Sequence, residues 1–210
     1  MPEQFKAVFS RNDDYQKIAF MNWRIGKGND ILNLLNIADG YMLAAVQLAK
    51  AALADNQWKT ADITIFPMLM NANHGIELYM KGMTWMLNLL TGSPNRIEGS
   101  HNIQQIYDTV RAKLQGYTGN LSLKAFDEAT ANLKEYISEL NRKLQPDVKK
   151  DKMDFSRYPI DNSYQEYFYV TEMGNVEIDL ENFVERFEDI HKQLGLLTDF
   201  LFHQELHQDW

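Results

Sequence analysis

The chain has 210 residues, of which 45% are hydrophobic and 12% aromatic, and its net charge is −8. This length suffices for one domain with a substantial core, and the composition excludes a disordered chain. The absence of cysteine excludes disulfides and thiolate metal sites, and it fits the reducing cytoplasm. An acidic chain is also a poor general binder of nucleic acid, because phosphate contacts need clustered Lys and Arg.

Residues 1–29 are expected to form an N-terminal extension. Polar stretches at 12–14 and 26–29 surround a short apolar piece, and the first residues lack the apolar core of a signal peptide. Charged residues interrupt the longest apolar runs of the chain; they are Lys50, Glu77 and Lys81. We therefore expect no membrane span and a cytoplasmic protein.

Helical periodicity dominates residues 30–145, which we expect to hold the first four helices of a single domain covering residues 1–210. Either Asn29 or Asp30 is a suitable N-cap for the first of them. The predicted helices are about 30–55, from near Asp62 or Pro67 to Leu90, about 102–115 and about 122–144. The second is so apolar that we expect it at the centre of the fold.

The remainder of the chain is expected to contain a loop, a β-hairpin and a last helix. A charged loop at 145–152 precedes the loop and hairpin region, residues 155–180. Its turn is predicted at 173–175, because apolar and polar residues alternate after it. The last helix is predicted at 180–206, with Asp179 as a possible N-cap.

In the order of its motifs the chain resembles the HEPN superfamily (higher eukaryotes and prokaryotes nucleotide-binding domains). The matching segments are an Ala/Met/Leu-rich first helix, Gly75-Ile76-Glu77-Leu78-Tyr79-Met80-Lys81, Gly99-Ser100-His101-Asn102-Ile103, and Phe155-Ser156-Arg157-Tyr158-Pro159. The resemblance covers roughly residues 30–205. It implies an all-α bundle of four to five helices, often dimeric, here with the small hairpin inserted before the last helix.

Catalytic members of that superfamily are metal-independent ribonucleases of toxin–antitoxin, defence or RNA-processing systems, and they carry an Arg–x4–6–His motif. Two segments here fit it, Arg186 with His191 in the last helix and Arg96 with His101 in a loop. In both, an apolar residue follows the arginine where the family usually has a polar one. Residues five apart also lie roughly 140° apart around a helix, so Arg186 and His191 would not converge without a kink or a partner chain.

Other residues are candidates for ligand binding, each with a structural alternative. Glu77 and Lys81 are four residues apart on an apolar helix and are expected to pair, either to fix packing or to line a phosphate site. His101 stands where a helix begins, as a cap or as an anion contact. Arg157 and Tyr158 either anchor their loop or contact a phosphate beside aromatic rings.

We expect no cofactor and no metal site. His203 and His207 have a spacing compatible with zinc, but they lie at the end of the chain, where helices fray. Three functions stay open: a binding module for a nucleotide, RNA or protein partner such as an antitoxin; a ribonuclease using Arg186 and His191; and a structural or regulatory partner. A homodimer is expected, and the ribonuclease requires one to bring two Arg186 and His191 pairs into one cleft.

Overall fold

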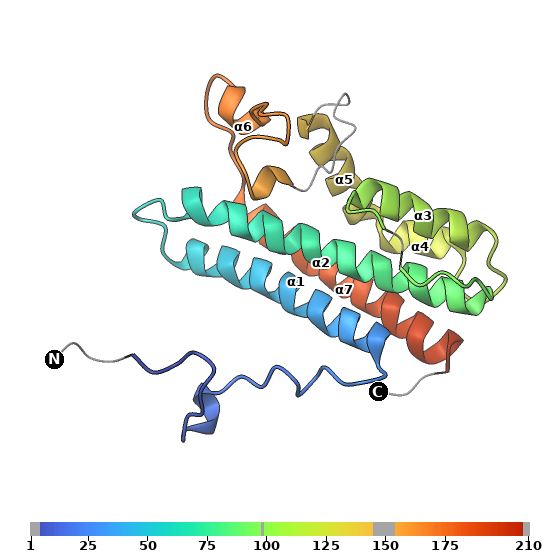
Figure 1. Ribbon diagram of the computed structural model, residues 1–210. Coiled ribbons are helices and arrows are strands. Elements are labelled where there is room, and N and C mark those ends of the chain that lie inside the picture. The colour runs from blue at the N-terminus through green and yellow to red at the C-terminus, as the bar shows by residue number, and fades with distance from the viewer. Residues whose placement is uncertain (1–4, 98, 145–153, 208–210) are drawn as a thin grey trace.

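The computed structural model of the chain describes residues 5–97, 99–144 and 154–207, and within these ranges the fold is all-α (Figure 1). The helices are α1 (Asp30–Ala54), α2 (Ala61–Leu90), α3 (Ile103–Gln115), α4 (Leu123–Ala129), α5 (Ala131–Leu144), α6 (Phe168–Thr171) and α7 (Leu180–Asp199). Short 3₁₀ turns occur at Tyr15–Lys17 and Asp154–Ser156, and a π-helical turn at Phe200–Glu205 follows α7. The prediction of an all-α fold is confirmed.

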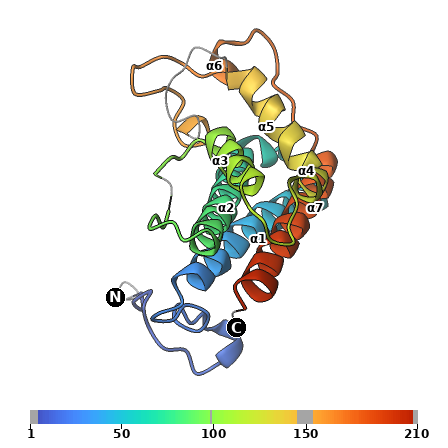
Figure 2. The ribbon, with the colours of Figure 1, turned by 90° about the vertical axis from the view of Figure 1, so that its right-hand side faces the viewer.

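Three long helices form the body of the fold. α1 and α2 are antiparallel neighbours, and α7 packs along both (Figures 1 and 2). α3 lies on another side of α2, and α4 and α5 lead from it back to α7. α2 is thus the central helix, as its apolar sequence predicts, and almost every residue from 72 to 88 is buried.

By length and composition alone, α1 is the one described helix that meets the requirements of a membrane span. The core helices of soluble proteins meet the same requirements. Here one face of α1 packs against α2 and α7.

Glycines let α1 and α2 approach closely. A Cβ atom built on Gly75 would lie 2.7 Å from the Met42 Cγ and 3.1 Å from the Ala38 carbonyl oxygen. At Gly82, the same atom would lie 2.8 Å from a Leu35 methyl group. Gly75 therefore tolerates an added side chain less well than Gly82, since a backbone atom cannot move aside as a flexible side chain can.

We expect Gly75→Val to lower the free energy of unfolding by about 2 kcal/mol, because the added methyl groups must displace α1. Gly40 on α1 is the matched control, because a Cβ there meets nothing within 4 Å. Gly40→Ala should stabilise the protein by about 0.5–1 kcal/mol. Urea denaturation of both variants measures these changes, and equal effects at the two glycines would contradict the close approach.

Helix ends agree well with the sequence patterns. The Asp179 side chain caps α7 by accepting hydrogen bonds from the N–H groups of Glu181 and Asn182, as predicted. Asn29 stands at the N-cap position of α1, although its side chain makes no capping bond. Of the two predicted starts of the second helix, the one near Asp62 is confirmed, because α2 begins at Ala61 and Pro67 lies inside it.

The fourth predicted helix is two helices. The break lies at Thr130, whose hydroxyl donates to the Phe126 carbonyl oxygen at 2.7 Å and also contacts the Tyr107 hydroxyl at 3.1 Å. This buried threonine ends α4, and α5 begins at the next residue. The last predicted helix also divides, because its final turn is π-helical.

The predicted β-hairpin is not formed in the described residues, because residues 172–179 contain no strand. Met173 is fully exposed and Ile178 is 41% exposed, so the alternating apolar residues do not build a buried sheet face. A strand needs a neighbouring strand for its backbone N–H and C=O groups, and this segment has none.

The chain reverses direction earlier than predicted. Ile160 and Glu166 form an isolated antiparallel bridge, and Asp161 N–H donates to the Gln165 carbonyl oxygen at 2.8 Å. The Asp161 carboxylate also accepts the N–H groups of Ser163 and Gln165. An aspartate that bonds its own downstream backbone favours a turn at this point.

Candidate functional site

A line of polar side chains runs along α2 inside the fold. Five polar or charged residues of this helix are buried: Asn73, Glu77, Lys81, Thr84 and Asn88. At 3.6 residues per turn these positions fall within ~80° of arc, so they share one face. Buried polar groups need partners. Neighbouring helices supply them at both ends of the line, where Tyr136 donates to Asn73 and Lys113 donates to Asn88.

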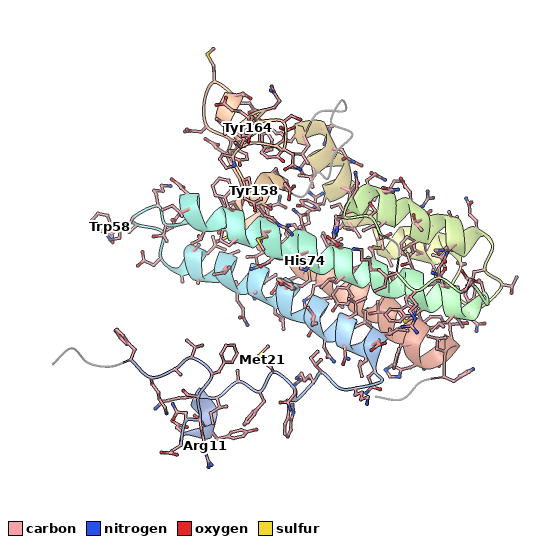
Figure 3. The ribbon with its side chains drawn as sticks, viewed as in Figure 1. Arg11, Met21, Trp58, His74, Tyr158 and Tyr164 are labelled. Atoms are coloured by element: carbon pink, nitrogen blue, oxygen red, sulfur yellow. The ribbon has the colours of Figure 1, made fainter. Side chains whose placement is uncertain are left out.

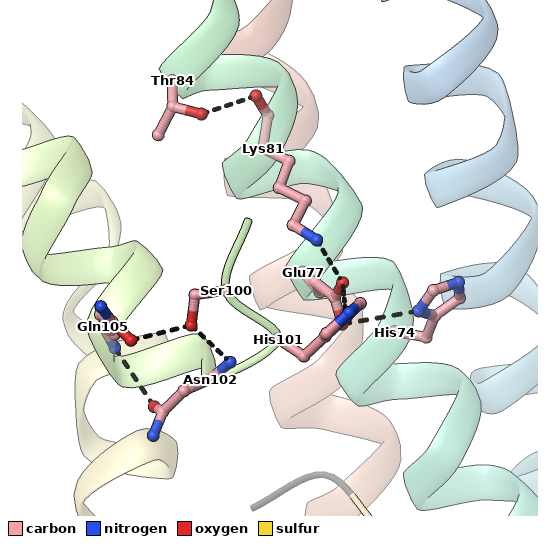
Figure 4. A network of polar contacts seen from close by, with 8 residues as sticks. All are labelled: His74, Glu77, Lys81, Thr84, Ser100, His101, Asn102 and Gln105. Carbon is pink, nitrogen blue, oxygen red and sulfur yellow. Dashed lines mark hydrogen bonds and ion pairs between the residues drawn. The ribbon is translucent and has the colours of Figure 1, made fainter. Parts of the chain in front are cut away.

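Glu77 is the centre of this line (Figure 4). Its side chain is 2% exposed, and it contacts three basic side chains. Lys81 Nζ donates to Glu77 Oε1 at 2.7 Å, and His101 Nδ1 lies 2.9 Å from the same oxygen. His74 Nδ1 lies 3.7 Å from Glu77 Oε2. The predicted Glu77–Lys81 pair is present, and two histidines extend it.

These contacts keep the Glu77 carboxylate ionised. Burial by itself would raise the pKa of Glu77, but the contacts with His74 and Lys81, the charge of Lys81 and the contact with His101 lower the pKa to about 2. Because an ionised carboxylate only accepts hydrogen bonds, the His101 Nδ1 must be the protonated donor. The imidazole therefore turns its Nε2 away from Glu77.

The loop before α3 holds His101 at the surface. Ser100 Oγ accepts the Asn102 N–H at 3.0 Å and donates to Gln105 Oε1 at 2.9 Å. The Asn102 side chain caps α3 by accepting the Gln105 N–H. The His101 side chain is 58% exposed, whereas the Glu77 side chain that orients it is buried. The site thus presents a fixed imidazole to solvent above a buried carboxylate.

Sequence reasoning named Glu77, Lys81 and His101 separately and missed His74. The missed signal was spacing, because His74 lies three residues before Glu77 and so shares its face of α2. His101 was predicted to cap α3 or to contact an anion, and the capping role belongs to Asn102. The contact between His101 and Glu77 spans 24 residues of sequence and has no local pattern.

Arg186 and His191 diverge, as their spacing on a helix predicts. The Arg186 guanidinium donates to Glu135 Oε2 at 2.9 Å and to Glu139 Oε2 at 3.0 Å, both on α5. His191 Nε2 lies 2.5 Å from Asp39 Oδ1 on α1. The two side chains therefore face different neighbouring helices, and within this chain they do not form one catalytic pair.

Asp39 belongs to a second polar cluster. It accepts a hydrogen bond from the Tyr79 hydroxyl at 3.1 Å in addition to the His191 contact. Burial raises the pKa of Tyr79 well above its usual range, and the charges of Asp39 and Asp199 add to the effect. Tyr79, Asp39 and Asp199 also line a cavity of about 590 Å³ between the N-terminal extension and the helices. Two carboxylates in its wall make this cavity a poor site for a phosphate.

The two side chains of the second Arg–x4–His segment, Arg96 and His101, also have different partners. The Arg96 guanidinium lies over the Trp85 ring, 6.0 Å from its centroid, while His101 faces Glu77. No carboxylate in the described residues pairs with Arg96. Trp85 is one turn beyond Lys81 on α2, so Arg96 and the Glu77 cluster lie on the same side of that helix.

The remaining candidates are not part of the Glu77 cluster. Arg157 lies 3.7 Å from the carboxylate of Asp154, and Tyr158 is 60% exposed in the segment that packs above α2 (Figure 3). His203 lies in the π-helical turn, whereas His207 follows it with a left-handed backbone, φ 54°. No set of three metal-binding side chains occurs in residues 5–97, 99–144 and 154–207.

The chain was also compared with family profiles, with curated proteins and with solved structures, and it matched none of them.

Proposed function

We propose that this protein is a HEPN-like binding module that recognises the phosphate of a nucleotide or of RNA and does not cleave it. The imidazole of His101, fixed by the buried Glu77 carboxylate, carries the proposal. A protonated His101 beside that carboxylate can donate its Nε2–H to a phosphate oxygen, and charge-assisted bonds of this kind are the strong ones. The order of the motifs in the sequence supports the HEPN assignment.

Arg96 adds a second cation to the proposed phosphate site. Its guanidinium lies over the Trp85 ring, and Arg96 precedes His101 by five residues in the sequence. A guanidinium held against an aromatic face keeps its N–H donors free for a phosphate. Lys81 contributes differently, because its ammonium group is buried and neutralises Glu77. With Lys81 in place, a bound phosphate meets little net repulsion from the carboxylate.

The ribonuclease alternative rests on the same histidine. A carboxylate that holds the inner nitrogen of an imidazole leaves the outer nitrogen ready to act as a general base. Arg186 and His191 do not support the alternative, since each is tied to a carboxylate on a different helix. Cleavage of RNA would therefore depend on His101, or on a second copy of the chain.

The regulatory-partner alternative rests on the outer face of α1, where Ile37 and Leu43 are exposed. We retain the homodimer, the cytoplasmic location and a defence-system partner such as an antitoxin as parts of the HEPN-like proposal.

The proposed phosphate site predicts that AMP binds more tightly than adenosine. In His101→Ala, AMP affinity should fall by about 10- to 100-fold, the effect of losing one hydrogen bond to a charged group, while adenosine affinity should not change. Isothermal titration of both ligands makes the comparison. His207→Ala is the matched control, because His207 is also exposed and lies 106 residues from His101, near the end of the sequence. Equal binding of AMP and adenosine to the unaltered protein would overturn the proposal.

A cleavage assay separates binding from catalysis. We expect the protein to leave a mixed RNA pool intact in the absence of divalent metal. Cleavage that is lost in His101→Ala would support the general-base alternative. Cleavage that is lost in His191→Ala would instead support a ribonuclease whose active site combines Arg186 and His191 from two copies of the chain.

A further inference from the structure

The N-terminal extension differs in charge from the rest of the protein. Residues 5–27 contain five basic and two acidic residues, a net charge of +3, which leaves −11 for the remainder of the chain. Asp14, one of the two acidic residues, caps the 3₁₀ turn and pairs with Lys17 at 3.0 Å. The extension is therefore a basic segment on an acidic protein.

The extension lies outside the bundle (Figure 1), and it exposes large apolar side chains (Figure 3). Seven of them are exposed, and five of the seven are aromatic: Phe5, Val8, Phe9, Tyr15, Phe20, Met21 and Trp23. Four of the aromatic residues have a basic residue one or two positions later; the pairs are Phe5 with Lys6, Phe9 with Arg11, Tyr15 with Lys17 and Trp23 with Arg24. Such interleaving of stacking rings and cations is typical of segments that bind single-stranded nucleic acid.

Residues 15–24 of the extension line a small cavity. The rings of Tyr15 and Phe20 are 5.8 Å apart and those of Phe20 and Trp23 are 6.2 Å apart, both pairs tilted. These rings, with Met21 and Arg24, line a cavity of about 260 Å³. Aromatic cages also bind methylated ammonium groups, but a guanidinium in the wall repels a cation and attracts a phosphate.

The cavity is fixed to the bundle. Asn36 on α1 donates to the Arg24 carbonyl oxygen at 2.8 Å, and Asn33 exchanges two hydrogen bonds with the backbone of Gly26. Trp23 and Arg24 also line the larger cavity against α1 and α7. The aromatic cavity therefore keeps a defined position although the extension lies outside the core.

We propose that residues 15–24 bind a base of a single-stranded nucleic acid, with the rings of Tyr15, Phe20 and Trp23 stacking on the base and Arg24 contacting its phosphate. This proposal specifies the ligand of the proposed function as a single-stranded nucleic acid. It rests on the proposed function only in taking the ligand to be a nucleotide or a nucleic acid. It also explains how an acidic protein holds a polyanion, because this segment carries a net charge of +3 while the chain as a whole carries −8.

The test is fluorescence anisotropy of fluorescein-labelled U12 and dT12 strands added to the full-length protein. We expect both strands to bind, with affinity falling as salt rises, and Trp23→Ala to weaken binding at least about tenfold. Trp58→Ala is the matched control, since Trp58 is 84% exposed at the turn between α1 and α2 (Figure 3). Its binding should equal that of the unaltered protein, and circular dichroism should show both variants fully helical.

Two results would overturn the proposal: failure of both strands to bind, or equal loss in Trp23→Ala and Trp58→Ala. If the strands fail while vesicles of phosphatidylcholine and phosphatidylserine bind and Trp23→Ala abolishes that binding, the extension is a membrane contact instead. AMP titration of Trp23→Ala separates this proposal from the His101 site. If Trp23→Ala binds AMP normally but no longer binds U12, the result supports both sites. If the unaltered protein binds U12 but not AMP, only the His101 site is ruled out.

Discussion

Glu77→Ala should lower the free energy of unfolding by about 3–5 kcal/mol, the cost of removing one partner of a buried ion pair. The variant leaves the Lys81 ammonium, whose side chain is only 10% exposed, without its carboxylate. It also opens a cavity in the central helix of the fold. Guanidinium denaturation followed by circular dichroism at neutral pH measures the loss.

A double variant tests the cause of that loss. Glu77→Ala with Lys81→Met removes both charges and keeps an apolar side chain of similar length on α2. We expect it to recover much of the stability, because replacing a buried ion pair by apolar residues is often neutral or favourable. If the double variant is as unstable as Glu77→Ala, the loss comes from packing and the pair has no special role.

Acid should destabilise the protein in a way that depends on Glu77. The folded state lowers the pKa of this carboxyl from 4.5 to about 2, so ionised Glu77 stabilises the fold fully above pH 4.5. That stability, about 3 kcal/mol for a difference of this size, is lost as the pH falls from 4.5 towards 2. Chemical denaturation repeated between pH 7 and pH 2.5 follows the loss.

Other carboxyl groups contribute to the same acid range, so a variant is needed for comparison. The pKa of Asp127 is lowered by its hydrogen bond with Arg111, and that of Glu205 by its hydrogen bond with Tyr117. Glu77→Gln retains these groups and lacks only the central carboxylate. Its stability should therefore fall less steeply below pH 4.5 than that of the unaltered protein. Parallel curves for the two proteins would show that Glu77 is not held ionised.

The helical architecture follows from the sequence because periodic apolar residues give each helix one face to bury. The boundaries of α1 and α3 and the start of α7 fall within a few residues of the prediction, and Asn102 and Asp179 cap the starts of α3 and α7. The break between α4 and α5 was missed, because Thr130 acts through a hydrogen bond to Tyr107, 23 residues away. The prediction of a β-hairpin was wrong, because alternating apolar and polar residues form a strand only where a second strand can pair with them.

The candidate site was less predictable than the fold. The i, i+4 spacing of Glu77 and Lys81 is a local pattern, and it predicted their ion pair. The contacts of Glu77 with His101 and of Asp39 with His191 join distant parts of the chain, 24 and 152 residues apart. Short motifs do not encode such contacts. The packing of α7 against α1 brings His191 to Asp39, and the packing of α3 and its preceding loop against α2 brings His101 to Glu77.

The most direct test of the proposed binding function is nuclear magnetic resonance of the histidine side chains during addition of AMP. The chain has five histidines, so each imidazole can be assigned with single His→Ala variants. We expect the Nε2 signal of His101 to shift on addition of AMP, while the signals of His191 and His207 stay in place. A shift of His191 with His101 unchanged would contradict it and would place the ligand at the Asp39 cavity.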